Sequence, residues 1–356
     1  MRFTMRYCTA GLLTVWLLAA GLSGCQPESP APASGPGESA APTSTPSLST
    51  EESAVPENTV REIPLEVSAG EYPLPALLTL PAGEEKAPAV ILLHGSGASD
   101  MDETVYENRP FQDLAQGLAE RGIAVLRYDK RVYRYREAML EIPCGVEEDA
   151  LQDAQAAFRL LQGRPEIDPA RIYFAGHSQG GGFTGVLAQR EPEACGVICL
   201  AGTPRRLEDI TYEQFQRAGL SEDQLAAQRA VVEAIKALDD KEDPDPFFYY
   251  WGASELYWKT LNALDVPGDM RRTAESRPVL ILQGERDCQV FMEDFALWKE
   301  LLGPDNPQVT YRSYPELNHY FLPGQGDPNA EEYRIPGHIP DEVLYDIARW
   351  ILQGTL

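Results

Sequence analysis

The chain has 356 residues, an apolar fraction of 43% that includes 9% aromatic residues, and a formal charge of −25 at pH 7. These values indicate a globular protein with a sizeable hydrophobic core, and α/β folds often reach this length as one domain. The strong negative charge excludes nucleic acid and an anionic membrane surface as electrostatic partners.

The first residues predict an exported lipoprotein. Arg2 and Arg6 accompany the apolar run AGLLTVWLLAAGL, which is short for a membrane-spanning helix and typical of a secretory signal. Leu22-Ser23-Gly24-Cys25 follows and resembles the bacterial lipobox, in which the signal is cleaved before a cysteine that is then lipidated. The resemblance implies a signal peptide over 1–24 and an extracytoplasmic, membrane-anchored protein. The alternative is an uncleaved anchor in which LSGC occurs by chance.

A tether follows the cysteine. Residues 26–60 contain five glutamates among Pro, Ser, Ala, Thr and Gly, with no Lys or Arg, so they cannot build a core. Together with Cys25 they form a predicted anchor and disordered tether over 25–60. Flexible-chain scaling gives this segment a reach on the order of 30 Å.

From residue 61 to the C-terminus the sequence predicts one α/β domain. Residues 61–81 indicate two antiparallel strands around a turn. Short apolar runs then predict buried strands over 88–95, 123–129, 171–177, 195–202, 277–284 and 309–315. Amphipathic stretches predict helices near 108–121, 146–163, 179–190, 291–302 and 340–353. This alternation predicts a mostly parallel sheet with helices on both faces. Residues 203–276 show no strand candidate and predict a helical insertion.

The cysteines and histidines give no metal site. Cys195 and Cys199 lie four residues apart in a predicted strand, about 13 Å, which is too far for a disulfide. Cys144 and Cys288 are distant in sequence, and their pairing stays open. With no CxxC pair and only four histidines, no zinc-ligand spacing appears, and we expect no metal or other cofactor.

The segment RIYFAGHSQGGG carries the main functional signal. An apolar strand ends in Gly176-His177-Ser178-Gln179-Gly180, and a helix is predicted behind it. Glycines around a serine forfeit side-chain burial, so packing alone does not explain them. The pattern resembles the nucleophile elbow of the α/β-hydrolase superfamily, from about residue 61 to the end of the chain. The resemblance implies that Ser178 is a nucleophile at the carboxyl edge of the sheet, at a helix N-terminus.

The same resemblance implies a base and an acid, in the chain order Ser, acid, His. His319 lies just after the last predicted strand, where the family has its catalytic histidine, whereas His338 suits a structural or surface position. Asp287 follows the strand ending at residue 284 in a loop similar to the family's Gly-x-x-Asp-x-x-Val. Glu285 and Asp294 are the competing acids.

Two backbone amides are expected to form the oxyanion hole. One belongs to Gln179, and the resemblance of LLHGSG to the family's His-Gly-x-Gly turn assigns the other to Ser96, with His94 shaping the loop. Downstream, RYDKR (127–131) resembles a segment of bacterial esterases, but Val132 replaces the expected glycine. A solvated or ion-paired surface therefore accounts better for Arg131 than a catalytic role.

The predicted function is a serine esterase that acts on a small-molecule ester; its oligomeric state is left open. The insertion is expected to cap the site, with six aromatic residues as pocket candidates or, alternatively, as the core of the cap: Phe247, Phe248, Tyr249, Tyr250, Trp251 and Trp258. A serine peptidase of the same superfamily is the first alternative. A lipid-tethered binding protein with a vestigial site is the second.

The lipoprotein hypothesis gives a test by fractionation. We expect the full-length chain in a bacterial host to enter the membrane fraction and to carry the mass of a diacyl modification at Cys25, because two acyl chains anchor stably at about 0.8 kcal/mol per buried CH₂. The matched variant Cys25→Ala should lose both the membrane association and the added lipid mass. A wild-type chain that is wholly soluble, or unmodified at Cys25, would contradict the hypothesis.

Overall fold

A computed structural model describes residues 6–7, 60–83, 85–354 and 356. Cys25, and the predicted signal and tether apart from residues 6–7 and 60, lie outside this part of the chain. No helix among the described residues has both the length and the apolar character that a membrane crossing requires.

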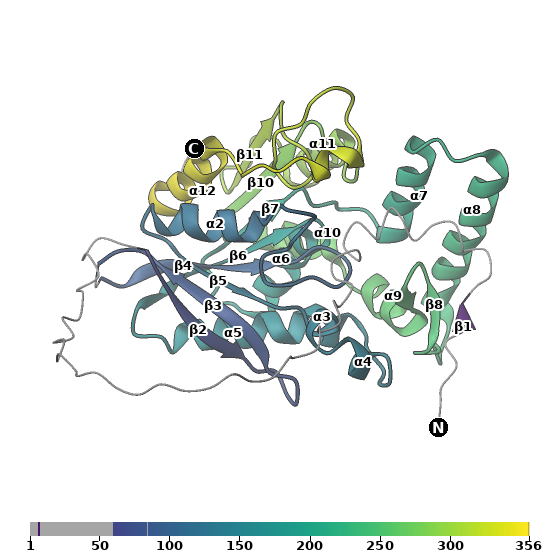
Figure 1. Ribbon diagram of the computed structural model, residues 1–356, viewed down its shortest axis with the longest axis horizontal. Coiled ribbons are helices and arrows are strands. Elements are labelled where there is room, and N and C mark those ends of the chain that lie inside the picture. The colour runs from purple at the N-terminus through teal and green to yellow at the C-terminus, as the bar shows by residue number, and fades with distance from the viewer. Residues whose placement is uncertain (1–5, 8–59, 84, 355) are drawn as a thin grey trace, which may run out of the picture.

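An eight-stranded sheet forms the centre of the molecule, with strand order β11-β10-β7-β6-β4-β5-β3-β2 (Figure 1). Neighbouring strands from β11 to β5 pair in parallel, and β3 and β2 continue the sheet antiparallel. The strands are β2 Arg61–Val67, β3 Leu74–Leu80, β4 Ala87–Leu93, β5 Ala124–Tyr128, β6 Ile167–His177, β7 Gly196–Leu200, β10 Val279–Gly284 and β11 Val309–Tyr314. The predicted fold class and strand positions are confirmed.

Helices cover both faces of the sheet. They are α2 Pro110–Ala119, α3 Arg131–Arg134, α4 Arg136–Met139, α5 Gln152–Gln162, α6 Gln179–Arg190, α11 Met292–Leu302 and α12 Asp341–Gln353. A π-helical turn, η3 Glu147–Leu151, precedes α5, and a 3-10 turn, η5 Ala330–Arg334, precedes α12. The five predicted helices of the core all form, with ends that shift by a few residues.

Two hydrophobic cores lie on opposite faces because side chains alternate along each strand. In β4, Val90 and Leu92 face a core that α2 and α12 complete, while Ile91 and Leu93 face the core of α5 and α6. All seven residues of β4 are buried. The continuous apolar run of this strand is therefore explained by burial on both faces.

The RYDKR segment contributes buried ion pairs. Arg127 is 1% exposed and its guanidinium lies 2.7 Å from Asp102 and 2.9 Å from Glu62. Arg131 pairs with Asp153 at 2.5 Å, and both side chains are at least nine-tenths buried. Of the two accounts predicted for Arg131, ion pairing holds and solvation does not.

The interval between β7 and β10 folds as a cap beside the sheet (Figure 1). It consists of α7 Leu207–Arg217, α8 Glu222–Lys236, η4 Ala237–Asp240, β8 Phe248–Tyr250, β9 Ala253–Ser254, α9 Glu255–Asn262 and α10 Val266–Ala274. Helix α10 lies directly on α6, where a Cβ on Gly185 would approach Met270 Cα to 2.8 Å. The cap is thus anchored on the helix that follows Ser178.

The expectation of a cap without strands is wrong, because β8 and β9 form a short hairpin. Its connecting residues, Trp251 and Gly252, both have positive φ, at 49° and 84°. Such a pair gives the tight turn that suits the twist of a two-residue hairpin. In addition, β8 pairs in parallel with β1 Arg6–Tyr7. The hairpin forms from a short aromatic run followed by Gly252.

The four cysteines of the domain are free thiols, among them Cys144 and Cys288. The open question of a disulfide between these two residues is settled within the described residues: they do not pair.

Candidate active site

Ser178 occupies a strained turn between β6 and α6. Its φ of 54° and ψ of −119° fall in a region that side chains rarely adopt. The flanking glycines make this turn possible by close approach of backbones. A Cβ on Gly176 would lie 2.0 Å from the carbonyl oxygen of Gly180, and one on Gly180 would lie 2.5 Å from that of Leu93. Gly176 and Gly180 are therefore required because no larger residue fits at these two positions of the turn.

Asp287 and His319 lie side by side at the carboxyl edge of the sheet. Asp287 Oδ2 is 2.7 Å from His319 Nδ1, and both side chains are buried. The Asp287 carboxylate also accepts the backbone N–H groups of Gln289 and Val290 and the side-chain amide of Gln283, at 2.7 to 2.9 Å. These donors hold the carboxylate in one orientation toward the imidazole.

The competing residues have other partners. Asp294 is fully buried and pairs with Arg205, while Glu285 accepts a hydrogen bond from Ser313 at the surface. His338 is 87% exposed and lies 2.9 Å from Asp113. The structure therefore places Asp287 alone, among the three candidate acids, against His319.

Ser96 lies in the loop that follows β4, here called the oxyanion loop after the role predicted for the Ser96 amide. Ser96, Ser178 and Gln179 line the same cleft. His94 Nε2 lies 2.9 Å from the Asp100 carbonyl oxygen, and burial lowers the pKa of His94 to about 4. A neutral histidine with a fixed backbone partner suits the loop-shaping role expected of His94.

Sequence reasoning did not single out Glu103 or the side chain of His177. Glu103 Oε1 accepts the N–H of Gly95 at 2.8 Å, and Glu103 Oε2 lies 2.9 Å from His177 Nδ1. His177 Nε2 in turn lies 2.9 Å from the carbonyl oxygen of His319. His177 was visible inside the elbow motif, but Glu103 carried no motif that would have marked it.

Ser178 lines a small cleft that is partly open to solvent. Its apolar walls come mainly from the cap and include Leu207, Ile210, Leu261, Leu264 and Val266, together with Phe183 and Val290 from the core. Polar residues, among them Thr203, Arg205 and Gln214, complete the lining. The chemistry of the cleft is therefore aliphatic with a polar border.

The six aromatic pocket candidates do not line this cleft: Phe247, Phe248, Tyr249, Tyr250, Trp251 and Trp258. The Trp258 indole donates to the Tyr250 carbonyl oxygen, and the Trp251 indole donates to Gln228. Trp251 also packs edge-on against Phe215. Trp251 of the hairpin and Trp258 of α9 thus pack within the cap, which agrees with the alternative that the cluster is cap core. Helix α7 and the segment from α9 to α10 supply the cleft walls instead.

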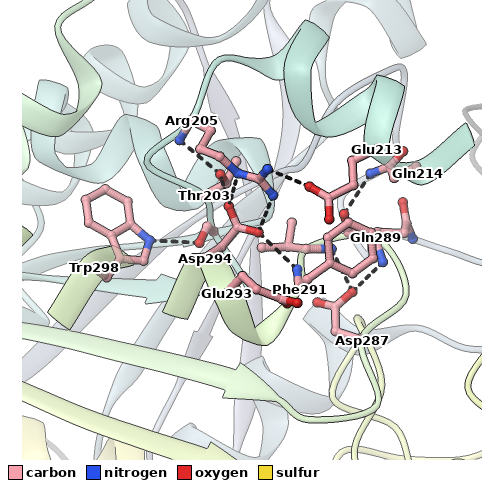
Figure 2. Close-up of polar contacts among 12 residues, drawn as sticks. Thr203, Arg205, Glu213, Gln214, Asp287, Gln289, Phe291, Glu293, Asp294 and Trp298 are labelled. Carbon is pink, nitrogen blue, oxygen red and sulfur yellow. Dashed lines mark hydrogen bonds and ion pairs between the residues drawn. The ribbon is translucent and has the colours of Figure 1, made fainter. Parts of the chain in front are cut away.

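Figure 2 shows how helix α7 is tied to the loop that carries Asp287. Arg205, at the start of the cap, pairs with Asp294 through two nitrogens at 2.7 Å and with Glu213 of α7 at 2.6 Å. Gln214 of α7 donates to the carbonyl oxygen of Gln289, whose own N–H donates to Asp287. The cap and the acid loop therefore share one hydrogen-bonded network.

The chain is similar in sequence to a known protein family and to two curated proteins. The family model described as the alpha/beta hydrolase family matches residues 90–336. The chain is 35% identical over 284 residues to esterase EstD of Thermotoga maritima, covering 79% of this chain and 66% of that protein. It is 28% identical over 174 residues to the uncharacterized peptidase YtmA of Bacillus subtilis, covering 48% and 56%. The matches thus span less than two thirds of the length of each of these curated relatives.

Solved structures show the same fold. The acylaminoacyl peptidase of Pyrococcus horikoshii superposes with a TM-score of 0.52 at 16% identity, over 82% of this chain and 41% of that one. The 2,6-dihydroxy-pseudo-oxynicotine hydrolase gives 0.50 at 17% identity, over 84% and 69%. At these identities the likeness concerns the fold alone.

The elbow gives a prediction about stability. Gly180→Ala should lower the free energy of unfolding by about 3 kcal/mol or more, because the new Cβ overlaps backbone oxygens that cannot move without shifting β4. The control is Gly337→Ala, where nothing lies within 4 Å of the added Cβ. Urea unfolding measures both. Equal midpoints for the two variants would contradict the steric argument.

The cap network gives a second prediction. Arg205→Leu leaves the fully buried Asp294 carboxylate without its cation and should cost about 3 kcal/mol of unfolding free energy. Arg272→Leu is the matched control, since this cap arginine pairs with Asp265 and Asp269 at the surface. Thermal unfolding should show a clear drop in Tm for Arg205→Leu only. Similar Tm values in both variants would mean that Asp294 tolerates the loss of its partner.

Proposed function

Because the chain belongs to the α/β-hydrolase family, we propose that it hydrolyses carboxylic esters through an acyl-enzyme on Ser178. The observation that carries the proposal is the buried pair of Asp287 and His319, 2.7 Å apart, at the same sheet edge as the strained Ser178 turn. An esterase among the relatives, EstD, supports the reaction class.

The first half of the reaction forms the acyl-enzyme. His319 Nε2 takes the proton of Ser178 Oγ while this oxygen attacks the ester carbonyl carbon. The carbonyl oxygen becomes an oxyanion that accepts hydrogen bonds from the amides of Ser96 and Gln179. The tetrahedral intermediate then collapses, the bond to the alcohol oxygen breaks, and the proton on His319 passes to the departing alcohol.

The second half regenerates the enzyme. A water molecule gives a proton to His319 Nε2 and attacks the acyl carbon, and the resulting intermediate releases the carboxylic acid as Ser178 Oγ regains its proton. Throughout, Asp287 accepts the hydrogen bond of His319 Nδ1–H and so fixes the tautomer in which Nε2 faces the serine. The three donors to Asp287 keep its charge oriented for that task.

The aliphatic walls of the cleft support an ester with an apolar acyl or alcohol group. A peptidase activity is the alternative within the same machinery, since the match to YtmA names a peptidase. A panel of p-nitrophenyl esters of increasing acyl length, assayed beside aminoacyl anilides, separates the two. Faster turnover of the anilides than of every ester would favour the peptidase. If neither the esters nor the anilides are turned over, a binding protein with a vestigial site is favoured.

The location of the enzyme is a separate proposal. A lipid on Cys25 would tether the domain to a membrane outside the cytoplasm, as the lipobox-like segment indicates. The tether reach of about 30 Å exceeds the screening length of about 8 Å, so the acidic domain would not be repelled by an anionic surface.

The nucleophile is tested by covalent labelling. A fluorophosphonate should label the wild-type chain at one residue, because only an activated serine attacks it readily. Ser178→Ala should abolish the labelling while the protein stays folded by circular dichroism. Labelling that persists in this variant would assign the nucleophile to another residue.

The base and acid are tested by ester turnover. His319→Ala should lower kcat by about 10⁴-fold or more, and Asp287→Asn by about 10³- to 10⁴-fold, since the base survives but its orientation does not. The exposed His338→Ala is the control and should leave kcat nearly unchanged. A large loss in the control variant would show that the histidine assignment is wrong.

A further inference from the structure

Both backbone polar groups of Gly95, in the oxyanion loop, are held by buried charged side chains. Its N–H donates to Glu103 Oε1 at 2.8 Å, and its carbonyl oxygen accepts from the Lys130 ammonium at 3.2 Å. Lys130 itself pairs with the buried Asp149 at 3.0 Å. Because the Gly95 amide is already satisfied, it cannot turn into the cleft. The next amide, that of Ser96, donates to no protein acceptor among the described residues.

The backbone around Glu103 is held in an unfavourable conformation. Its φ is 51°, in the left-handed region that a glutamate seldom adopts. The Glu103 N–H donates to the Asp100 carbonyl oxygen at 3.0 Å, and the Asp100 side chain accepts from the N–H and hydroxyl of Thr104. Strain of this kind persists only where the surroundings enforce it. Here it directs the carboxylate inward, where the residue is 7% exposed.

The second carboxylate oxygen of Glu103 is connected to His319, the proposed general base, through His177. Glu103 Oε2 lies 2.9 Å from His177 Nδ1, and His177 Nε2 lies 2.9 Å from the carbonyl oxygen of His319. The rings of His177 and His319 lie 4.5 Å apart between centroids. Three contacts therefore join Gly95 to the backbone of the base through a side chain next to Ser178.

An ionised Glu103–His177 pair fits these contacts. In the protonated imidazole, Nε2–H donates to the His319 carbonyl oxygen, and Nδ1 lies 2.9 Å from Glu103 Oε2 as an ion-pair contact without the alignment of a hydrogen bond. Burial by itself would lower the pKa of His177, but Glu103 raises it above its usual value. Burial by itself would likewise raise the pKa of Glu103, but His177 brings it below its usual value. Both directions favour the charged forms.

We propose that Glu103 is a positioning residue whose carboxylate couples the oxyanion loop to the loop of the general base, by bridging the Gly95 amide and His177. It sets the direction of the Ser96 amide at one end and the place of His319 at the other. The inference rests on the proposed function, because it assigns Glu103 a task in that reaction.

The experiment compares Glu103→Ala and Glu103→Gln with wild-type enzyme. The alanine variant loses both contacts and should lower kcat about 100-fold, as the loss of one oxyanion donor does, with KM changed by less than about threefold. The glutamine variant keeps an acceptor for Gly95 and an N–H for a neutral His177, and should recover kcat to within about tenfold of wild type.

A matched control separates positioning from stability. Asp153→Asn breaks another buried ion pair, with Arg131, and among the described residues neither partner is hydrogen-bonded or ion-paired to Ser178, Asp287, His319 or Glu103. It should lower Tm while kcat of the folded enzyme stays within about twofold of wild type. A kcat of Glu103→Ala that also stays near wild type in folded protein would overturn the proposal, as would a loss in Asp153→Asn equal to that in Glu103→Ala.

Coupling is measured by a double-mutant cycle with His177→Ala. If Glu103 acts through His177 as well as through Gly95, the double variant should lose less kcat than the product of the two single losses. Strictly multiplicative losses would overturn the coupling. If Glu103→Ala does not fold, the same cycle is run with Glu103→Gln.

The rate of fluorophosphonate labelling at Ser178 gives a readout that does not depend on the choice of ester. Slower labelling in Glu103→Ala than in Asp153→Asn supports the proposal even if the natural substrate is not an ester. A wild-type chain that is neither labelled nor active on any substrate of the panel would overturn the proposed function, and this inference with it. Normal wild-type activity with an unaffected Glu103→Ala would overturn this inference alone.

Discussion

The close approach of backbones at the Ser178 turn is the constraint on which the rest of the site depends. Gly176 and Gly180 come so near to each other and to β4 that no Cβ fits at either position. This contact holds Ser178 at a φ of 54° and sets the first turn of α6 against the end of β4. The oxyanion loop leaves β4 at that point, so its distance from the serine follows from the same contact.

Buried charges then fix the loops around this turn. Parallel strands deliver their loops to one edge of the sheet, but the strands alone do not orient the loops. Asp287 is oriented by three hydrogen-bond donors, and Gly95 is held from both sides by Glu103 and Lys130. A buried ion pair gives little net stability, because desolvation offsets most of its attraction. In this site the buried ion pairs orient the loops, because a buried charge that moved away from its partner would be left uncompensated.

Three helices of the cap contact the edge of the sheet at which Ser178 lies. Helix α10 packs on α6, and helix α7 reaches the acid loop through Arg205, Asp294 and Gln214 (Figure 2). From a third element, α9, the Tyr257 hydroxyl donates to the side chain of Gln179 at 2.9 Å. The cap therefore contacts both the loop that carries Asp287 and the residue that follows Ser178.

The sheet, its flanking helices and the position of Ser178 could be predicted from the sequence, because they follow from local periodicity and from glycines at positions where no Cβ fits. The β8–β9 hairpin escaped because three aromatic residues are too few to show a strand period. The family resemblance already favoured Asp287 as the acid, and the contacts in the structure separate it from Asp294: both follow the same strand, but Asp287 lies against His319 whereas Asp294 pairs with Arg205. Only the tertiary structure decided the cleft walls and the partners of Glu103, whose contacts join the loop after β4 to the end of β6. Spacing along the chain carries no record of such contacts, because each depends on where the sheet and cap place the loops.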